Sequence, residues 1–334
     1  MSRSALTVLT TPILSAPRRA YRGARRALRP LLKPGVPLPA ASPYPGHYAV
    51  TRSVVDGMRD IGADFNFNPP SFADLARIVY APANEALRQA ADLKRQGKID
   101  YLVAGPVNAL FSDECDSILR MPEIDRLIVA CDWALAFYDD APALKGKSGV
   151  CPCGVDTAFW SPSASAKDAV VVYWKSGSPE FCERVEAAAA GHGLLPIRVA
   201  SAHGEHRGFT SAEFRAQLDR AVIAVFLSSF ETQGIALAET WAMNVPTLVW
   251  DPKGPAEWRG RTFQSGSSCP YLTAATGIAW RTLDELELAL AEALSHCDRF
   301  QPRAWVLGNM TDAICARKLY RLILDGAESM AAAR

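Results

Sequence analysis

Hydrophobic and polar residues alternate with the periods of strands and helices from residue 44 onward. Short runs rich in Val, Ile, Leu and aromatic residues indicate buried strands, and longer runs with apolar residues three or four apart indicate helices. Strands that alternate with helices favour a parallel sheet built from βαβ units. In the first half, the pattern predicts strands over 63–68, 77–82, 99–106 and 125–132, and helices over 47–62 and 84–98.

A stretch dense in Gly, Pro and Ser interrupts the pattern at residues 145–162. A second alternating series follows it, so we expect two doubly wound α/β domains joined by a hinge near residues 148–160. The second series predicts strands over 169–174, 194–200, 221–229 and 245–250, and helices over 179–193, 211–221 and 234–244.

The 334 residues are enough for two domains of ordinary size, and we expect four parts in the chain. Residues 1–43 form a basic N-terminal arm of little order. Residues 44–150 form the first Rossmann-like domain, and residues 151–300 form the second. Residues 301–334 form a C-terminal helical segment.

The N-terminal arm concentrates positive charge in a protein whose formal net charge is only +1. Residues 1–50 contain no Asp or Glu, so the remainder of the chain is mildly acidic. A cationic segment with interspersed apolar residues can contact an anionic membrane reversibly, whereas a solvated disordered tail and a nucleic-acid arm are the alternatives. We expect no nucleic-acid partner. The basic residues are Arg3, Arg18, Arg19, Arg22, Arg25, Arg26, Arg29 and Lys33.

The eight cysteines include no C-x-x-C pair, and Cys151-Pro-Cys153 lacks the further ligands of a zinc site. We interpret the cysteines as reduced packing residues and expect no metal or other cofactor. No apolar run approaches the roughly 20 residues of a membrane span. The predicted location is the cytoplasm, with peripheral contact at the inner face of the membrane through the arm.

Two glutamates, Glu231 and Glu239, flank a run of small and apolar residues where the strand over 221–229 ends. Ligands bind beyond the carboxyl ends of strands in α/β sheets, and the N–H groups that open a helix suit a phosphate or a hydroxyl. Gly234 allows a ligand to approach the main chain closely.

Glu239 lies in a helix that is apolar on almost every face, so we expect its carboxylate to be buried and to need a partner. A pair of ligand hydroxyl groups is one candidate. The alternative is that Glu231 complements the helix dipole and that Glu239 is a solvated surface residue.

The segment "ETQGIALAETWAMNVPTLVWD" (231–251) resembles the nucleotide-sugar-binding segment of the retaining GT-B glycosyltransferases of the glycosyltransferase group 1 family. It has two glutamates at that family's spacing, a Gly three residues after the first, a small-residue helix, a Pro and a strand. The segment "CGVDTAFWSP" (153–162) resembles the start of that family's C-terminal domain. The resemblance implies a GT-B fold, two Rossmann-like domains facing a central cleft, with the helix over 311–324 crossing back to the first domain.

The resemblance also implies that residues 44–150 form the acceptor side and that residues 151–300 bind the nucleotide sugar. It further implies roles for residues of this second domain. Glu239 would bind the ribose hydroxyls of the donor, and Glu231 would contact the donor sugar near the reacting carbon. Main-chain N–H groups would come from Gln233, Gly234 and Ile235.

Lys175 stands where the family has a basic residue against the diphosphate, and there it would neutralise the leaving group. Without that motif, Lys175 would be a solvated residue at a strand end. The family's second basic residue is replaced here by the small residues at 176–178, and Arg184 is a candidate substitute.

His47 and Asn108 are candidates for the acceptor side of the site. His47 opens the helix over 47–62, where the family has a glycine-containing loop, and the alternative is an exposed loop histidine. Asn108 lies in the segment 104–114, and the alternative is that this segment is a plain connection between a strand and a helix. No D-x-D triplet occurs, which favours a metal-independent enzyme.

The function implied is transfer of a sugar from a nucleotide-diphosphate sugar to an unidentified acceptor, with retention of anomeric configuration. A glycan, a lipid-linked molecule or a small molecule could accept the sugar. Two alternatives remain open, a sugar-nucleotide epimerase of the same fold and a non-catalytic sugar-nucleotide-binding protein.

Overall fold

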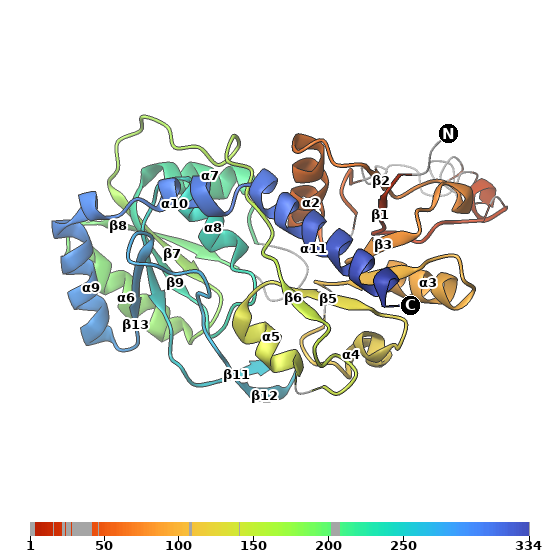
Figure 1. The fold of residues 1–334 in the computed structure, drawn as a ribbon. Coiled ribbons are helices and arrows are strands. Elements are labelled where there is room, and N and C mark those ends of the chain that lie inside the picture. The colour runs from red at the N-terminus through yellow and green to blue at the C-terminus, as the bar shows by residue number, and fades with distance from the viewer. Residues whose placement is uncertain are drawn as a thin grey trace. The chain divides into compact units, whose positions relative to one another are not determined.

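The computed structural model divides into two compact units, each with its own parallel β-sheet (Figure 1). The first unit comprises residues 1–129, 137–151 and 316–334, and the second comprises residues 130–136 and 152–315. The residues whose structure is described are 4–15, 17–21, 24, 28, 42–45, 47–106, 109–139, 141–201 and 208–333.

The first unit is built on a six-stranded parallel sheet in the order β2-β1-β3-β4-β5-β6. Its strands are β1 (Leu6–Val8), β2 (Phe65–Phe67), β3 (Ile78–Ala81), β4 (Tyr101–Ala104), β5 (Arg126–Val129) and β6 (Ser148–Val150). The helical segments that accompany it are α2 (Tyr48–Asp60), η1 (Phe72–Asp74), α3 (Asn84–Arg95), α4 (Glu114–Ser117), η2 (Ile118–Arg120), α5 (Asp132–Asp139) and α11 (Asp312–Ala332). The first residues of α5 and the first residues of α11 belong to the second unit, and the remainder of each helix belongs to the first.

The core of the first unit forms where α2 and α11 cover the sheet. In α2, Val54 and Met58 lie four residues apart, so their side chains project from one face of the helix. They pack in one buried cluster with Leu6 and Val8 of β1. From Ala316 onward, α11 adds apolar side chains to the same cluster, which also contains Leu319 and Ile323.

Strand β1 corrects the predicted start of the first domain. Its residues were expected in a poorly ordered arm that ended at residue 43, but β1 lies inside the sheet and pairs in parallel with β2 on one side and β3 on the other. Leu6 and Val8 are fully buried there. The first domain therefore begins well before residue 44.

The second unit contains a five-stranded parallel sheet in the order β13-β10-β9-β7-β8, and a separate antiparallel hairpin of β11 and β12. Its strands are β7 (Ala169–Trp174), β8 (Leu195–Ala200), β9 (Ala221–Leu227), β10 (Thr247–Trp250), β11 (Pro255–Trp258), β12 (Arg261–Gln264) and β13 (Gly277–Trp280). Its helical segments are α6 (Pro179–Gly191), α7 (Ser211–Arg220), α8 (Ile235–Ala242), α9 (Leu283–Ser295), η3 (Cys297–Arg299) and α10 (Pro302–Asn309).

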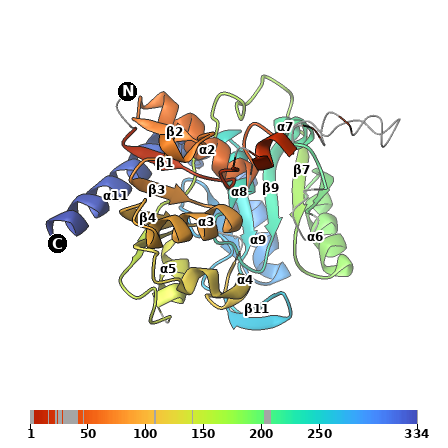
Figure 2. The same ribbon diagram turned by 90° about the vertical axis from the view of Figure 1, so that its right-hand side faces the viewer.

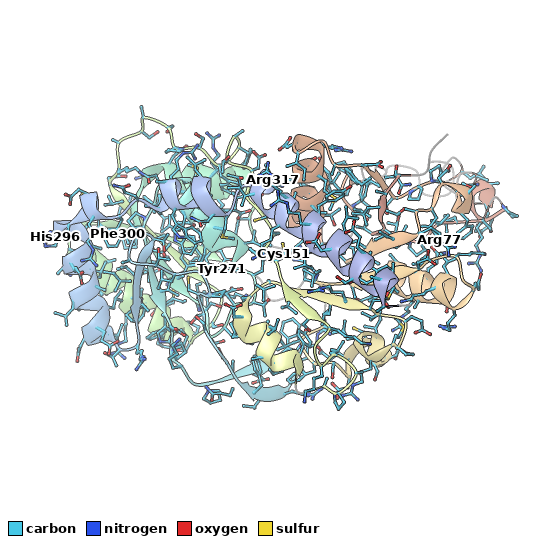
Figure 3. The ribbon with its side chains drawn as sticks, in the orientation of Figure 1. Arg77, Cys151, Tyr271, His296, Phe300 and Arg317 are labelled. Carbon is cyan, nitrogen blue, oxygen red and sulfur yellow. The ribbon has the colours of Figure 1, made fainter. Side chains whose placement is uncertain are left out.

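Helices cover both faces of the second sheet, because successive side chains of a strand point to opposite faces. In β7, Val170 and Val172 pack in one buried cluster with α6 and α9, whereas Val171 and Tyr173 pack in another with α7, α8 and α10. Phe300, labelled in Figure 3, follows η3 and belongs to the cluster of α6 and α9. Because side chains on both faces of β7 are buried, the sequence of β7 is a continuous apolar run.

The predicted α/β architecture with two parallel sheets is therefore confirmed. Strands and helices alternate along the chain in both units, as the hydrophobic pattern indicated. Among the described helices, none is both long and apolar enough to cross a lipid bilayer.

The close pairing of β10 and β13 gives a test of the packing. Gly277 pairs with Thr247, and a Cβ atom at Gly277 would lie 1.9 Å from the Thr247 carbonyl oxygen. We expect Gly277→Ala to lower the free energy of unfolding by about 1–3 kcal/mol, the usual cost of overpacking a core. Urea denaturation followed by circular dichroism measures the change.

Gly191→Ala is the matched control for Gly277→Ala. Gly191 ends α6, and a Cβ atom there would meet no atom within 4 Å. Alanine favours helix more than glycine by roughly 1 kcal/mol, so this variant should be neutral or more stable. Equal losses in both variants would contradict the packing of β10 against β13.

Candidate functional site

The strand order of the second sheet reverses at β7, since β8 lies on one side of β7 and β9 lies on the other. Figure 2 shows β7 beside β9. In open α/β sheets, ligands bind beyond the carboxyl ends of the strands at such a reversal. Lys175 directly follows β7, and the segment 228–234 directly follows β9. The main-chain N–H of Lys175 donates to the Leu227 carbonyl over 2.9 Å, so both segments leave the sheet together.

The structure brings Lys175 and Glu231 into direct contact. Lys175 Nζ lies 2.6 Å from Glu231 Oε1, and the hydroxyl of Ser228 donates to the same oxygen over 3.2 Å. The ammonium group also lies 5.9 Å from the centre of the Phe230 ring. The side chains of Lys175 and Glu231 are 35% and 18% exposed, respectively, so a ligand can still reach both charges. An incoming phosphate would meet the ammonium group, and a hydroxyl would meet the carboxylate.

Helix α8 begins next to this ion pair, and the residues predicted to offer main-chain N–H groups, Gln233, Gly234 and Ile235, lie at its start. Gly234 caps α8 with a φ of 60°, a left-handed conformation that favours glycine. Ile235 is the first residue of the helix, where N–H groups have no acceptor within the helix and the positive end of the helix dipole lies. The side-chain oxygen of Gln233 accepts a hydrogen bond from the Cys153 N–H over 3.2 Å, which ties the loop to the start of the second unit.

Glu239 occupies the interior of α8, five residues after the cap. It is 6% exposed, as the apolar helix around it predicts, so the alternative of a solvated surface glutamate is wrong. Every residue from Ala236 to Ala242 is buried. A carboxylate in such surroundings is stable only when polar groups satisfy it.

A pocket of about 460 Å³ adjoins Lys175 at the carboxyl ends of β7 and β8. The Arg198 guanidinium lies 5.6 Å from the centre of the Trp174 ring and forms two hydrogen bonds of 2.6 Å with Glu186. These bonds raise the pKa of Arg198, so it remains a cation. The described lining residues include Trp174, Lys175, Arg198, Phe209, Glu213 and Gln217.

Arg198 is a pocket cation that the sequence analysis did not identify. Arg184, the substitute proposed from the sequence, is exposed on α6 and is absent from the described lining of the pocket. The position of Arg198 at the pocket follows from the order of the strands, because parallel pairing sets Arg198 opposite Val172 of β7. Without that pairing, the sequence gives no reason to place Arg198, and not another arginine of a strand, at the pocket.

The acceptor-side candidates belong to the first unit. His47 is exposed and precedes α2, and its carbonyl accepts a hydrogen bond from the Thr51 N–H over 2.9 Å. Asn108 lies outside the described residues. Across the described part of the chain, no three His, Cys, Asp or Glu side chains gather closely enough to hold a metal ion.

Comparisons with known proteins identify the fold. No protein-family model matches the sequence, and no curated protein matches it. A structure of Anabaena HepE in complex with UDP and glucose has 12% sequence identity and a TM-score of 0.58, and the match covers 96% of this chain and 99% of that one.

Two further solved structures match over almost their whole length. The apo form of the lipopolysaccharide outer core galactosyltransferase WaaB has 10% identity and a TM-score of 0.54, and the match covers 97% of this chain and 99% of that one. Sucrose-phosphate synthase from Thermosynechococcus elongatus has 13% identity and a TM-score of 0.52, with coverage of 97% and 100%. The chain therefore has the GT-B fold, with two Rossmann-like α/β units, as its sequence predicted.

Proposed function

We propose that the protein is a retaining glycosyltransferase of the glycosyltransferase group 1 type, which moves a sugar from a nucleotide-diphosphate sugar to an acceptor. The observation that carries this proposal is the contact of Lys175 Nζ with Glu231 Oε1 at the strand-order reversal, beside the start of α8. The GT-B fold supports it. The HepE structures contain UDP with glucose, or UDP-glucose, so UDP-sugars are the first donors to test.

Transfer makes the diphosphate more negative as the sugar leaves it. Lys175 would stabilise that charge together with the positive end of α8, because fixed charges aimed at a developing anion lower the barrier. These groups take the place of a divalent metal ion. Glu231 would accept a hydrogen bond from a sugar hydroxyl near the reacting carbon, after the donor's phosphate has drawn Lys175 away from it.

The bond changes balance without an Asp or Glu nucleophile. The bond between the sugar's anomeric carbon and the diphosphate oxygen breaks, and its electron pair stays on that oxygen. The acceptor oxygen forms its bond to the anomeric carbon on the same face, and its proton passes to the departing diphosphate. This course retains the anomeric configuration.

The remainder of the donor would contact the neighbouring parts of the second unit. Its nucleoside would enter the pocket lined by Trp174 and Phe209, where aromatic rings offer flat surfaces to a base. Glu239 would accept hydrogen bonds from the two ribose hydroxyls. His47 and Asn108 are proposed as contacts of the acceptor.

The arm gives a separate proposal, peripheral attachment of a cytoplasmic enzyme to an anionic membrane. Residues 17–21 are helical and exposed, and they include Arg18 and Arg19. Tyr21 is 67% exposed and Leu28 is 51% exposed. Each basic residue near an anionic surface contributes about 1 kcal/mol.

The donor assignment is tested by thermal-shift measurements with UDP-, GDP- and ADP-sugars, followed by NMR of the product. A ligand at 100 times its Kd stabilises the folded protein by about 2.7 kcal/mol, so one nucleotide class should raise the Tm clearly. Transfer to an acceptor with the donor's anomeric configuration supports the proposal. A changed sugar on the same nucleotide would indicate an epimerase, and stabilisation without turnover would indicate a binding protein.

The two glutamates should differ in their effects. Glu231→Gln should lower kcat by roughly a hundredfold, as expected when about 2.7 kcal/mol of transition-state stabilisation is lost, and leave the Kd of the free nucleotide nearly unchanged. Glu239→Gln should weaken nucleotide binding by about 1.5–3 kcal/mol, the range for hydrogen bonds to a charged group. Steady-state kinetics and calorimetry measure the two effects.

Glu292→Gln is the control for both glutamate variants, because Glu292 pairs with Arg299 on the surface of the second unit. It should change neither kcat nor nucleotide Kd. If the Glu231 and Glu239 variants lose nucleotide affinity equally and keep kcat, both carboxylates serve the nucleotide or the fold, and the assigned roles are wrong.

Membrane attachment is tested by reversing charge within the arm. Deleting residues 1–40 would remove β1 from the sheet, so the double variant Arg18→Glu/Arg19→Glu is the better probe. It should reduce sedimentation with anionic liposomes at low salt, and high salt should abolish the binding of the unaltered protein. The matched control, Arg317→Glu/Arg321→Glu on the exposed side of α11, makes the same change in net charge. Equal binding by the two variants would contradict attachment through the arm.

A further inference from the structure

Both main-chain polar groups of Glu231 are hydrogen bonded to residues far away in the sequence. The Glu231 N–H donates to the Ser267 carbonyl over 3.0 Å. The Glu231 carbonyl accepts a hydrogen bond from the indole Nε1 of Trp133 over 2.9 Å. Trp133 belongs to the 130–136 segment of the second unit, so these bonds lie within one compact body.

The segment that carries Ser267 is itself anchored by a buried carboxylate. Asp251 follows β10 and is 6% exposed. Its Oδ1 accepts hydrogen bonds from the Ser268 N–H (3.2 Å) and hydroxyl (2.9 Å), and its Oδ2 lies 2.6 Å from Lys253 Nζ. A buried carboxylate with this many partners fixes the chain that supplies them.

Trp133 is held in place by close packing on two sides. Its ring stacks on Phe263, with the ring centres 6.5 Å apart and an angle of 18° between the planes. Gly266 lies so close that a Cβ atom there would be 2.4 Å from Trp133 Cβ and 2.5 Å from Trp133 Cγ. The indole N–H therefore has little freedom to leave the Glu231 carbonyl.

From these contacts we infer that Trp133 is a positioning residue for Glu231. Loops are more mobile than the strands that they follow, and a displacement of about 1 Å at a reacting group can cost a hundredfold in rate. Trp133 on one side and Ser267 on the other fix the main chain of Glu231, and thereby hold its carboxylate beside Lys175. The catalytic consequence of this inference rests on the proposed function, whereas the fixing of the loop does not.

Trp133→Phe tests the inference, because it keeps an aromatic ring on Phe263 and removes the indole N–H. Hydrogen exchange measured by mass spectrometry should become about tenfold faster in the peptide containing residues 228–234, since a lost tertiary bond favours local opening. In the transfer assay, kcat should fall about tenfold while KM for the donor stays within about twofold.

Trp250→Phe is the matched control for loss of an indole N–H. The Trp250 indole also donates to a main-chain carbonyl, that of Arg281, over 3.2 Å. This variant should leave both the exchange of the 228–234 peptide and kcat unchanged, even where its overall stability falls as much as that of Trp133→Phe.

A second perturbation reaches Trp133 from the opposite side. Gly266→Ala should displace the Trp133 ring and reproduce the faster exchange and the lower kcat of Trp133→Phe. Gly254→Ala is its control, because a Cβ atom there would meet only the Pro252 carbonyl oxygen, at 3.8 Å.

The outcomes separate this inference from the proposed function. Unchanged exchange of the 228–234 peptide in Trp133→Phe and Gly266→Ala would overturn the inference, whatever the activity of the protein. Faster exchange with unchanged kcat in an active enzyme would overturn the positioning role. If the unaltered protein transfers no sugar, the proposed function fails, and the exchange measurement still decides whether Trp133 fixes the loop.

Discussion

The parallel pairing of β7 with β9 determines where the charged groups of the site lie. Trp174 of β7 pairs with Leu227 of β9, so Lys175 leaves the sheet level with the segment that carries Glu231. A shift of one residue in this register would turn every side chain of β7 to the other face and move Lys175 away from Glu231. The ion pair and the position of Lys175 relative to the start of α8 depend on this register, whereas the neighbouring pocket depends on the pairing of β7 with β8.

Helices on both faces of the second sheet hold that register. Val170 and Val172 pack in one buried cluster, and Val171 and Tyr173 pack in the other. A one-residue shift of β7 would therefore bury the wrong set of side chains on each face of the sheet. The Glu239 carboxylate lies deep in a core of the second unit and is 6% exposed. Burial of that charge costs free energy unless polar partners offset it, and a donor bound at the start of α8 would add to those partners.

The parts of the fold that the sequence predicted are those with local patterns. The segment from Glu231 to Asp251 contains a loop, a helix and a strand in one run, so these elements could be predicted from the local pattern. The roles of its two glutamates stay predictions. Strand β1 was placed in the arm because its three residues gain their pairing partners only from β2 and β3, which lie more than 50 residues away. Strand β6 lies inside the predicted hinge because the segment 145–162 is dense in Gly, Pro and Ser, and Gly149 is one of these residues. In the structure, a Cβ atom at Gly149 would lie 3.1 Å from Leu322 Cδ1 of α11, so close helix packing accounts for that glycine.

The residues that support the site could not be found in the same way. Arg198 and Trp133 each lie in a segment whose periodicity is that of an ordinary strand or helix end, and their partners Glu186 and Glu231 lie 12 and 98 positions away. Trp133 and Glu231 are 98 positions apart, and no local pattern connects an indole N–H with a loop carbonyl over that separation. The motif contains groups proposed to meet the ligand, since Glu231, Glu239 and the start of α8 lie together on one loop and one helix. The groups that keep this loop in place are donors and acceptors from distant parts of the chain that the fold brings within about 3 Å of it. Only the three-dimensional structure reveals them.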